Sequence, residues 1–166
     1  HRRRHSFPTR RSSDLAGTTN AAGSADGPPQ VGRFAFPIGL AVVGDQLYVT
    51  DRDNHTVRKV SLAAGDLGTI TTVSGLAGTG TIVDGVGTAA RHKQPTYLTA
   101  VGNSLYLNES ADHILRKIDL ANLHVTKVSP GLCGFADGAS TVARYCNMTS
   151  LTSDGQGYLY YTDRSN

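Results

Sequence analysis

The stretch ADGPPQVGRFAFPIGLAVVGDQLYVTDRDNHTVRKV, residues 25–60, decides the fold because the chain repeats its pattern. Three copies begin at Asp-Gly pairs, with Asp26, Asp84 and Asp137 standing 58 and 53 residues apart. At near-constant offsets follow LYVTD (47–51), LYLNE (105–109) and LYYTD (159–163), the last displaced by one residue. HTVRKV (55–60) also matches HILRKI (113–118). Such matches predict a repeat architecture in which each copy is one structural unit.

Each copy supplies four short segments that we expect to be β-strands, because they are apolar and bounded by Gly, Asp and Asn. In the first copy these segments cover residues 38–43, 46–50, 55–61 and 69–74. The first two segments are linked by Gly44-Asp45, and their counterparts in the second copy by Gly102-Asn103. Two-residue links with glycine predict tight hairpin turns.

The strand order predicts the fold class. Alternation is expected to place Leu47, Val49, Val57 and Val60 on one apolar side. Four antiparallel strands in sequence form a meander, which is one blade of a β-propeller. We therefore predict an all-β fold, a partial β-propeller of four-stranded antiparallel meander blades, with about two and a half blades in this chain.

The predicted blades cover about residues 23–78, 79–132 and an incomplete 133–166, within a propeller unit at 16–166. Closed propellers usually have roughly four to eight blades, so we expect further blades beyond this chain. A partial propeller exposes apolar faces and open edges, and we expect it to be marginally stable alone.

The string DG…R…P…LYV-D…NH--RK resembles the NHL repeat of β-propellers, which is named after an Asn-His-Leu signature. This chain has NHT (54–56) in the first copy and DHI (112–114) in the second, and the second copy departs from the pattern at QPT (94–96) and NE (108–109). The resemblance covers residues 23–166 and implies a binding or scaffolding module for protein or polymer ligands. Bacterial-looking, Gly- and Thr-rich repeats suggest an exported, extracellular or cell-envelope setting.

Two other functions are consistent with the same resemblance. Related propellers include metal-dependent lyases and lactonase-like hydrolases, whose single axial cluster of His, Glu or Arg would have to lie in blades beyond this chain. Animal NHL domains bind RNA, which requires a basic face. The formal charge of +3 comes from residues 1–15, which hold five Arg and one Asp, while the remaining chain carries about −1 and makes nucleic acid an unlikely partner.

Residues 1–15 also differ in origin from the repeats. HSFPTRRSSDL (5–15) resembles the translation of a common sequencing adapter, so we exclude residues 1–15 from the fold as a non-native, disordered segment. The alternative is a genuine basic arm for nucleic acid or an anionic surface.

Several polar residues stand in loops where propellers meet ligands. The candidates for a ligand face are Arg52, Asp53, His55, Glu109, Asp112, His113, Arg33, Arg91 and Arg144. No catalytic residue, cofactor site or metal site is predicted, because polar groups that occur in every copy are explained more simply by a structural role within each blade. An enzymatic role is left open, although the sequence favours binding.

The repeated groups have both structural and functional interpretations. The acids that end the second strands, Asp51, Glu109 and Asp163, are expected to cap the next turn or to pair with Arg58 or Arg116; a cation-binding ring is the alternative. The repeated histidines would bind a metal only if they met at the axis. The repeated arginines 33, 91 and 144 are expected to pair with the Asp of the Asp-Gly turn or with the next blade, or else to bind anions. His92 and His124 are expected to be isolated surface groups.

Cys133 and Cys146 lie in one connection, where either a disulfide or two buried thiols fit; we expect the disulfide, which would indicate an oxidising compartment. No apolar run approaches the roughly 20 residues of a membrane span.

Overall fold

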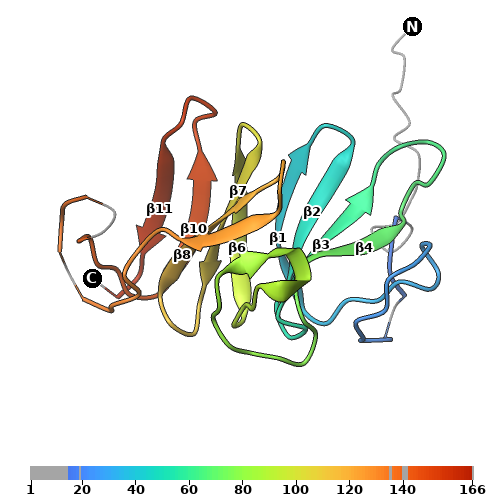
Figure 1. Ribbon diagram of the computed structural model, residues 1–166, viewed down its shortest axis with the longest axis horizontal. Coiled ribbons are helices and arrows are strands. Elements are labelled where there is room, and N and C mark those ends of the chain that lie inside the picture. The colour runs from blue at the N-terminus through green and yellow to red at the C-terminus, as the bar shows by residue number, and fades with distance from the viewer. Residues whose placement is uncertain (1–14, 19, 135, 140–141, 166) are drawn as a thin grey trace, which may run out of the picture.

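The computed structural model describes residues 15–18, 20–134, 136–139 and 142–165, arranged as three β-sheets in a row (Figure 1). The predicted segment 1–15 lies outside this range apart from Leu15. Among the described residues, no helix is long and apolar enough to cross a membrane.

The three sheets follow one another along the chain, and we call them blades 1, 2 and 3. Blade 1 contains β1 (Pro37–Val43), β2 (Gln46–Asp51), β3 (Thr56–Ser61) and β4 (Ile70–Gly75). Blade 2 contains β6 (Pro95–Val101), β7 (Ser104–Glu109), β8 (Ile114–Asp119) and β9 (His124–Lys127), with the short β5 (Gly85–Val86) beside β9 and a 3-10 turn η2 at Gly87–Ala89. Blade 3 consists of β10 (Met148–Ser153) and β11 (Leu159–Asp163). All pairings are antiparallel and follow chain order within each meander. The all-β, partial-propeller prediction is confirmed, and the four strands of blade 1 lie within one residue of their predicted bounds.

The predicted hairpin turns form because glycine stands at the first loop position. Gly44 has a φ of 58° and Gly102 a φ of 53°, a left-handed conformation that glycine adopts without a steric penalty. A positive φ at the first of two loop residues is typical of type II′ turns, whose twist matches that of the strands. Both turns lie at the same end of the blades (Figure 1).

Neighbouring blades meet through their first strands, because β1 packs on β6 and β6 on β10. Gly39 allows the closest approach, since a side chain there would collide with the backbone of Thr96 in the next blade. Thr50 fastens the same contact: its hydroxyl accepts the Gly39 N–H at 2.7 Å and donates to the Thr96 carbonyl.

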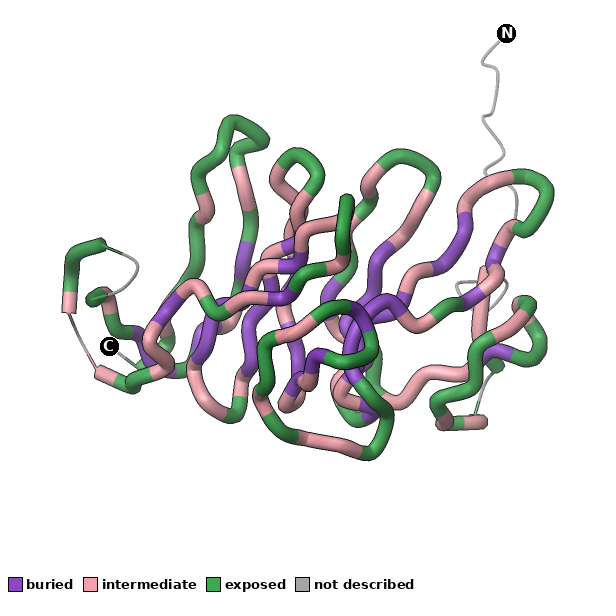
Figure 2. Tube along the Cα trace, in the orientation of Figure 1, coloured by how far each residue is buried: buried purple, intermediate pink, exposed green. Residues whose placement is uncertain are grey.

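The apolar core lies between the sheets, where the buried segments of Figure 2 face one another. One cluster fills the space between blades 1 and 2: Tyr48, Val57, Val73, Ala90, Leu98, Leu105, Leu107, Ile118 and Val125. A second joins blades 2 and 3: Leu115, Tyr145, Met148 and Leu151. A third, on the other face of blade 1, contains Val49, Val60 and Ile70, covered by Leu15, Ala16 and Phe34.

One detail of the predicted alternation is wrong. Val60 pairs with Leu47 and shares its face, but Val57 pairs with Thr50 and packs in the opposite cluster with Tyr48. Three residues separate Val57 from Val60, so the two-residue period of a strand sends them to opposite faces. Blade 1 is therefore apolar on both sides, as a stacked blade must be.

Candidate functional site

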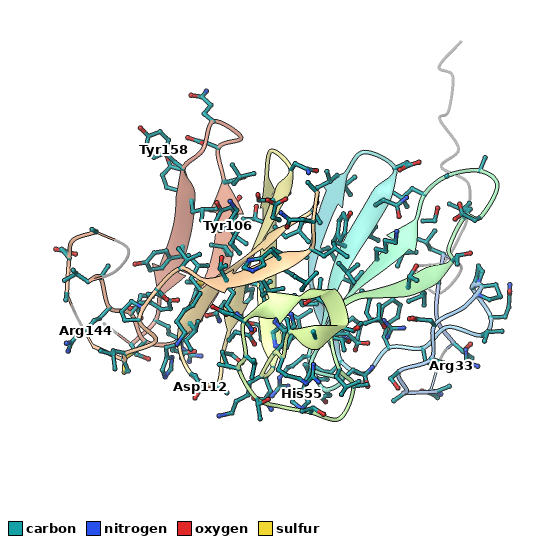
Figure 3. The ribbon with its side chains drawn as sticks, viewed as in Figure 1. Arg33, His55, Tyr106, Asp112, Arg144 and Tyr158 are labelled. Carbon is teal, nitrogen blue, oxygen red and sulfur yellow. A yellow bond between two sulfur atoms is a disulfide. The ribbon has the colours of Figure 1, made fainter. Side chains whose placement is uncertain are left out.

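His55 and Asp112 lie at the end of the blades that is opposite the two glycine hairpins (Figure 3). We define the turn face as the β2–β3 turn (52–55), the β7–β8 turn (110–113), and residues 36, 93, 94 and 147, which precede the first strands. Its residues divide into those that fasten the blades and those that remain exposed.

The acids that end the second strands are internal fasteners, by which we mean that they hold the loop before the first strand through hydrogen bonds. In each blade the carboxylate accepts a backbone N–H from the residue two positions before the first strand. The bonds join Ala35 N to Asp51 Oδ1 at 2.7 Å, Lys93 N to Glu109 Oε2 at 2.7 Å and Cys146 N to Asp163 Oδ2 at 2.9 Å. Because Asp51 and Glu109 are fully buried, Glu109 does not reach the turn face as a ligand group.

Arg58 is wholly buried, and its guanidinium links β3 to the end of β2 and to the Asp-Gly turn of blade 1. Its Nη1 lies 2.9 Å from Asp51 Oδ2, and its Nη2 lies 2.6 Å from Asp26 Oδ1 in the Asp-Gly turn. The same two nitrogens also donate to the carbonyls of Arg33 and Ala25. Paired charges with further hydrogen bonds offset the cost of burying a cation.

Arg116 repeats this arrangement in blade 2. It lies 2.7 Å from Asp84 and 3.4 Å from Glu109, and it donates to the carbonyls of Arg91 and Val83. We call the two arrangements the arginine clamps: Arg58 with Asp26 and Asp51, and Arg116 with Asp84 and Glu109. The expected pairing of the second-strand acids with Arg58 and Arg116 is therefore present.

Arg33 and Arg91 do not pair with the Asp-Gly turn, contrary to one expectation, because the clamp arginines occupy those carboxylates. Their own guanidinium groups cap nearby backbone carbonyls: Arg33 Nη1 donates to Gln30 O at 2.7 Å, and Arg91 Nη1 to Thr88 O at 2.7 Å. Arg144, in the third copy, is exposed.

Burial raises the pKa of Asp51 above its ordinary value, although hydrogen bonds from Asn54 and the Ala35 N–H and the charge of Arg58 oppose this shift. Asn54 donates to Asp51 Oδ2 at 2.6 Å and to the carbonyl of Gly23 at 2.7 Å. The charged form of Asp51 therefore depends on its three donors, and both carboxylate oxygens are engaged inside the blade.

The repeated histidines join one blade to the next. His55 Nδ1 accepts the N–H of Gln94 at 3.1 Å, and His113 Nδ1 accepts the N–H of Asn147 at 3.2 Å. Both acceptors have left-handed backbones, with φ of 59° and 54°. Within the part of the chain that the structure describes, no three His, Cys, Asp or Glu residues lie close enough to hold a metal ion.

His92 is not the surface group that the sequence suggested, whereas His124 is exposed. His92 is fully buried between blades 1 and 2, with Nε2 2.8 Å from the Ser74 hydroxyl and Nδ1 2.6 Å from Glu109 Oε1. Neighbouring residues gave no signal of this, because the contact joins different blades; aligning the three copies would have placed His92 with Phe34 and Tyr145.

The chain Ser74–His92–Glu109 has the connectivity of a hydrolase triad. However, no exposed surface leads to the Ser74 hydroxyl, because all three residues are fully buried. The next interface replaces the pair by Ser129 and Tyr145, whose hydroxyls lie 2.9 Å apart. A structural hydrogen bond between blades therefore explains both pairs.

The turn face keeps a small set of outward side chains. The guanidinium of Arg52 stacks 5.0 Å from the centre of the Phe36 ring, which is 60% exposed, and lies 3.8 Å from Asp53. In blade 2, Lys93 Nζ pairs with Asp112 at 3.0 Å. These groups can offer an apolar plate, donors and acceptors side by side.

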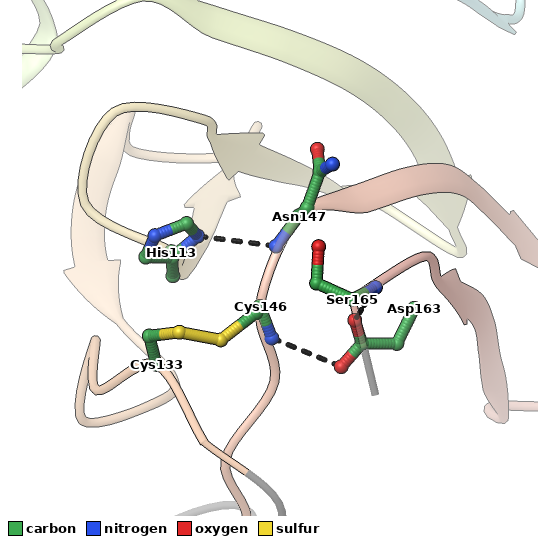
Figure 4. The surroundings of a disulfide bond; sticks show 6 residues. All are labelled: His113, Cys133, Cys146, Asn147, Asp163 and Ser165. Atoms are coloured by element: carbon green, nitrogen blue, oxygen red, sulfur yellow. Dashed lines mark hydrogen bonds between the residues drawn. A yellow bond between two sulfur atoms is a disulfide. The ribbon is translucent and has the colours of Figure 1, made fainter.

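Cys133 and Cys146 form a disulfide, with their Cα atoms 4.6 Å apart (Figure 4). Cys146 also donates its N–H to Asp163, and the next residue, Asn147, bonds to His113. The disulfide therefore anchors the connection between blades 2 and 3 where both repeated fasteners act.

Comparisons with known proteins agree with this geometry. Residues 34–60 match the NHL repeat family. SUPPRESSOR OF QUENCHING 1, chloroplastic, from Arabidopsis thaliana is 26% identical over an alignment of 146 residues that covers 83% of this chain and 14% of that protein.

Two solved structures have the same fold. An auxiliary nutrient binding protein from Bacteroides thetaiotaomicron is 22% identical with a TM-score of 0.69, and the match covers 81% of this chain and 36% of that one. Another auxiliary nutrient binding protein, from Bacteroides ovatus, is 23% identical with a TM-score of 0.62, covering 72% and 32% of the two chains.

Proposed function

Since this chain carries NHL-type β-propeller repeats, we propose that it is a binding or scaffolding module for a protein or polymer ligand, in an exported or cell-surface protein. The turn face is the proposed binding surface. Loops on a rigid scaffold are where recognition residues usually lie.

One observation carries this proposal: the outward groups of the turn face take no part in the arginine clamps or the inter-blade bonds. Arg52 stacks on exposed Phe36, and Asp112 pairs with Lys93 at the surface. An exposed aromatic plate beside mixed charges suits an extended ligand that has both apolar faces and hydrogen-bonding groups, such as a polysaccharide or a peptide.

Two further observations support the setting. The Cys133–Cys146 disulfide suits an oxidising compartment. The solved structures of similar fold include two auxiliary nutrient binding proteins, which is consistent with a ligand-binding role. A soluble ligand or a polymer segment would meet the turn face from solvent.

The test measures binding of the full chain to arrays of polysaccharides and peptides. We expect the variant Phe36→Ala/Arg52→Ala to lose at least about tenfold in affinity for any ligand found, because the stacked pair is removed. A matched control alters the opposite end of the same blades with Asp45→Ala/Asn103→Ala and is expected to bind normally. Equal binding by both variants would overturn the placement of the site.

A further inference from the structure

The two blade junctions that the structure describes share one hydrogen bond, in which a histidine ring accepts a backbone N–H from the next blade. His55 Nδ1 accepts the N–H of Gln94 at 3.1 Å. His113 Nδ1 accepts the N–H of Asn147 at 3.2 Å, as Figure 4 shows. We call these two bonds the histidine junctions. Both rings are half-buried, so solvent can exchange protons with them.

The donor residue of each junction is shared between two blades. Gln94 donates its N–H to blade 1, while its carbonyl accepts the N–H of Ser110 in its own blade at 3.3 Å. Asn147 donates its N–H to blade 2, while its carbonyl accepts the N–H of Arg164 in its own blade at 3.3 Å. The histidine bond therefore connects a residue that is held by its own blade to the blade before it.

The bond at Gln94 fixes the position of the ring proton of His55. A histidine nitrogen accepts a hydrogen bond only when it carries no proton, so the ring in this junction is neutral and has its proton on Nε2. Uptake of a second proton turns Nδ1 into a donor that faces the donor N–H of Gln94. Because two donors form no hydrogen bond, the cationic ring breaks the junction.

The ring has little room to turn away from Gln94. A Cβ atom at Gly80 would lie 2.9 Å from both Cε1 and Nε2 of His55, so the backbone of the loop 76–82 lies directly against the ring. His55 and Gln94 also have φ angles of 59° and 52°, in the left-handed region that residues other than glycine seldom adopt. Loss of the bond therefore removes a contact that holds two residues in a strained conformation.

Few other titratable groups lie on the elements around His55. The loop 76–82 contributes none. The neighbouring turns and the segment before β6 contribute Arg52, Asp53, His92, Lys93 and Asp112. Four of these side chains form two pairs of opposite charge, at 3.8 and 3.0 Å, and the remaining histidine is bonded to Glu109 between the blades. Histidine is the side chain that ordinarily changes its charge between about pH 5 and 8, so this range isolates the histidines from the carboxylates.

We propose that the His55 junction is a pH-sensitive switch within the turn face, closed while the ring is neutral and open once the ring has taken up a proton. Opening releases Gln94 from blade 1, and the preceding residue, Lys93, carries the ion pair with Asp112. Acid therefore changes how the blade 1 and blade 2 parts of the turn face are placed relative to each other. Weaker ligand binding in acid follows from this change, and that last step alone rests on the proposed function.

Hydrogen exchange of the full chain without any ligand tests the switch. Relative to an unprotected peptide at the same pH, the protection of the Gln94 amide should fall at least about fivefold between about pH 7.5 and about pH 5.5. The adjacent amide of Lys93 donates to Glu109 at 2.7 Å, and it is the internal control that should keep its protection. In nitrogen NMR of the His55 ring, Nδ1 should be the nitrogen without a proton at the higher pH, and it should titrate together with the change at Gln94.

Two variants assign the effect to one ring. His55→Asn, in which the acceptor is removed, should show low protection of Gln94 at both pH values. His124→Gln alters an exposed histidine and should keep the loss seen in the wild-type chain. Burial raises the pKa of Asp51, which is a second acid-sensitive group in blade 1. An acid-dependent loss of the same size in His55→Asn would assign the effect to that carboxylate and overturn the proposal.

Two results in the wild-type chain would also overturn the switch: equal protection of Gln94 at both pH values, or equal losses at Gln94 and Lys93, which would indicate general loosening of the blade. Neither measurement involves a ligand. A failure of the turn face to bind polysaccharides or peptides would therefore contradict the proposed function and leave the switch standing, and a failure of the switch would leave the binding test unaffected.

Discussion

Blades 1 and 2 hold the carboxylate at the end of their second strand with different side chains. Blade 1 has Phe34, Asp51 and Asn54; blade 2 has His92, Glu109 and Asp112 at the same repeat positions. In blade 1 the short carboxylate of Asp51 is held by Asn54 at 2.6 Å and by Arg58 at 2.9 Å. In blade 2 the longer Glu109 reaches His92 at 2.6 Å instead, while Arg116 lies farther away at 3.4 Å.

The difference also changes the surface. Asn54 is buried and bonded to Asp51, whereas Asp112 turns outward to pair with Lys93. Because His92 makes a hydrogen bond to Glu109, the side chain at position 112 does not have to bond to that acid, as Asn54 does to Asp51 in blade 1. Where the copies depart from one another, a side chain is released to the surface, so blade 2 presents the Lys93–Asp112 pair and blade 1 presents Phe36 beside Arg52.

The largest expected effect tests the part that the two blades share. Arg116→Met should lower the free energy of unfolding by about 3–5 kcal/mol or prevent folding, because it leaves the buried Glu109 without its cation. Arg91→Met, in the same blade, should cost about 0.5 kcal/mol, since Arg91 only caps carbonyls near the surface. Urea unfolding of both variants gives the comparison, and similar losses would remove the distinction between clamp and surface arginines.

The next prediction converts blade 2 toward blade 1. His92→Phe alone should cost about 1–3 kcal/mol, because it removes bonds to Glu109 and Ser74 in a buried interface. Adding Glu109→Asp and Asp112→Asn restores the blade 1 combination and should recover about 1 kcal/mol through coupling. Chemical unfolding of the single and triple variants measures the coupling, and strictly additive losses would contradict it.

A third effect concerns the interface between blades 2 and 3. Burial raises the pKa of Tyr145 to about 12, above that of an unfolded tyrosine, although its hydrogen bond with Ser129 opposes the shift. The native state therefore keeps the proton longer, and stability that is complete below about pH 10 is lost, by up to about 2 kcal/mol, as the pH rises toward 12.

Unfolding free energies at pH 8, 10 and 11 measure this loss. Tyr145→Phe should flatten the decline and leave a residual slope from Tyr48, whose pKa burial also raises. Tyr160→Phe, which alters a 54% exposed ring, is the control and should keep the wild-type slope. An unchanged slope in Tyr145→Phe would contradict the assignment.

The smallest effect tests the bonds between blades. His55→Asn should lower the free energy of unfolding by about 1 kcal/mol, because it removes the acceptor of the Gln94 N–H, while Asn tolerates the φ of 59°. Asp53→Asn, in the same turn, serves as the control, since its carboxylate makes only the 3.8 Å contact with Arg52. Thermal unfolding of both variants compares them, and a larger effect of Asp53→Asn would reverse the assignment.

Much of the fold could be predicted from the sequence because the repeat multiplies a weak local signal. LYVTD and LYLNE fixed the second strands, and Gly44 and Gly102 fixed the hairpins. Val57 lies on the other face from the one expected, because it is three residues from Val60 and the period of a strand is two residues.

The candidate site was harder to predict because it depends on partners in other blades. From the sequence, Arg33 is the expected partner of Asp26, but Asp26 pairs with Arg58 on β3, the strand beside β2. The burial of His92 is hard to predict for the same reason, because its partner Ser74 lies 18 residues away, in another sheet. The repeat shows which positions have a structural role, but the packing of the blades determines which side chain each of them contacts.

The most direct test of the account is hydrogen exchange at five backbone amides that lie outside the strands. Ala35, Lys93 and Cys146 donate to the strand-end acids, and Gln94 and Asn147 donate to the turn histidines. If the repeated acids and histidines are internal fasteners, these amides exchange as slowly as those of the adjoining strands. Exchange at the rate of an unprotected peptide would show that the acids and histidines are free, and the division between framework and turn face would fail.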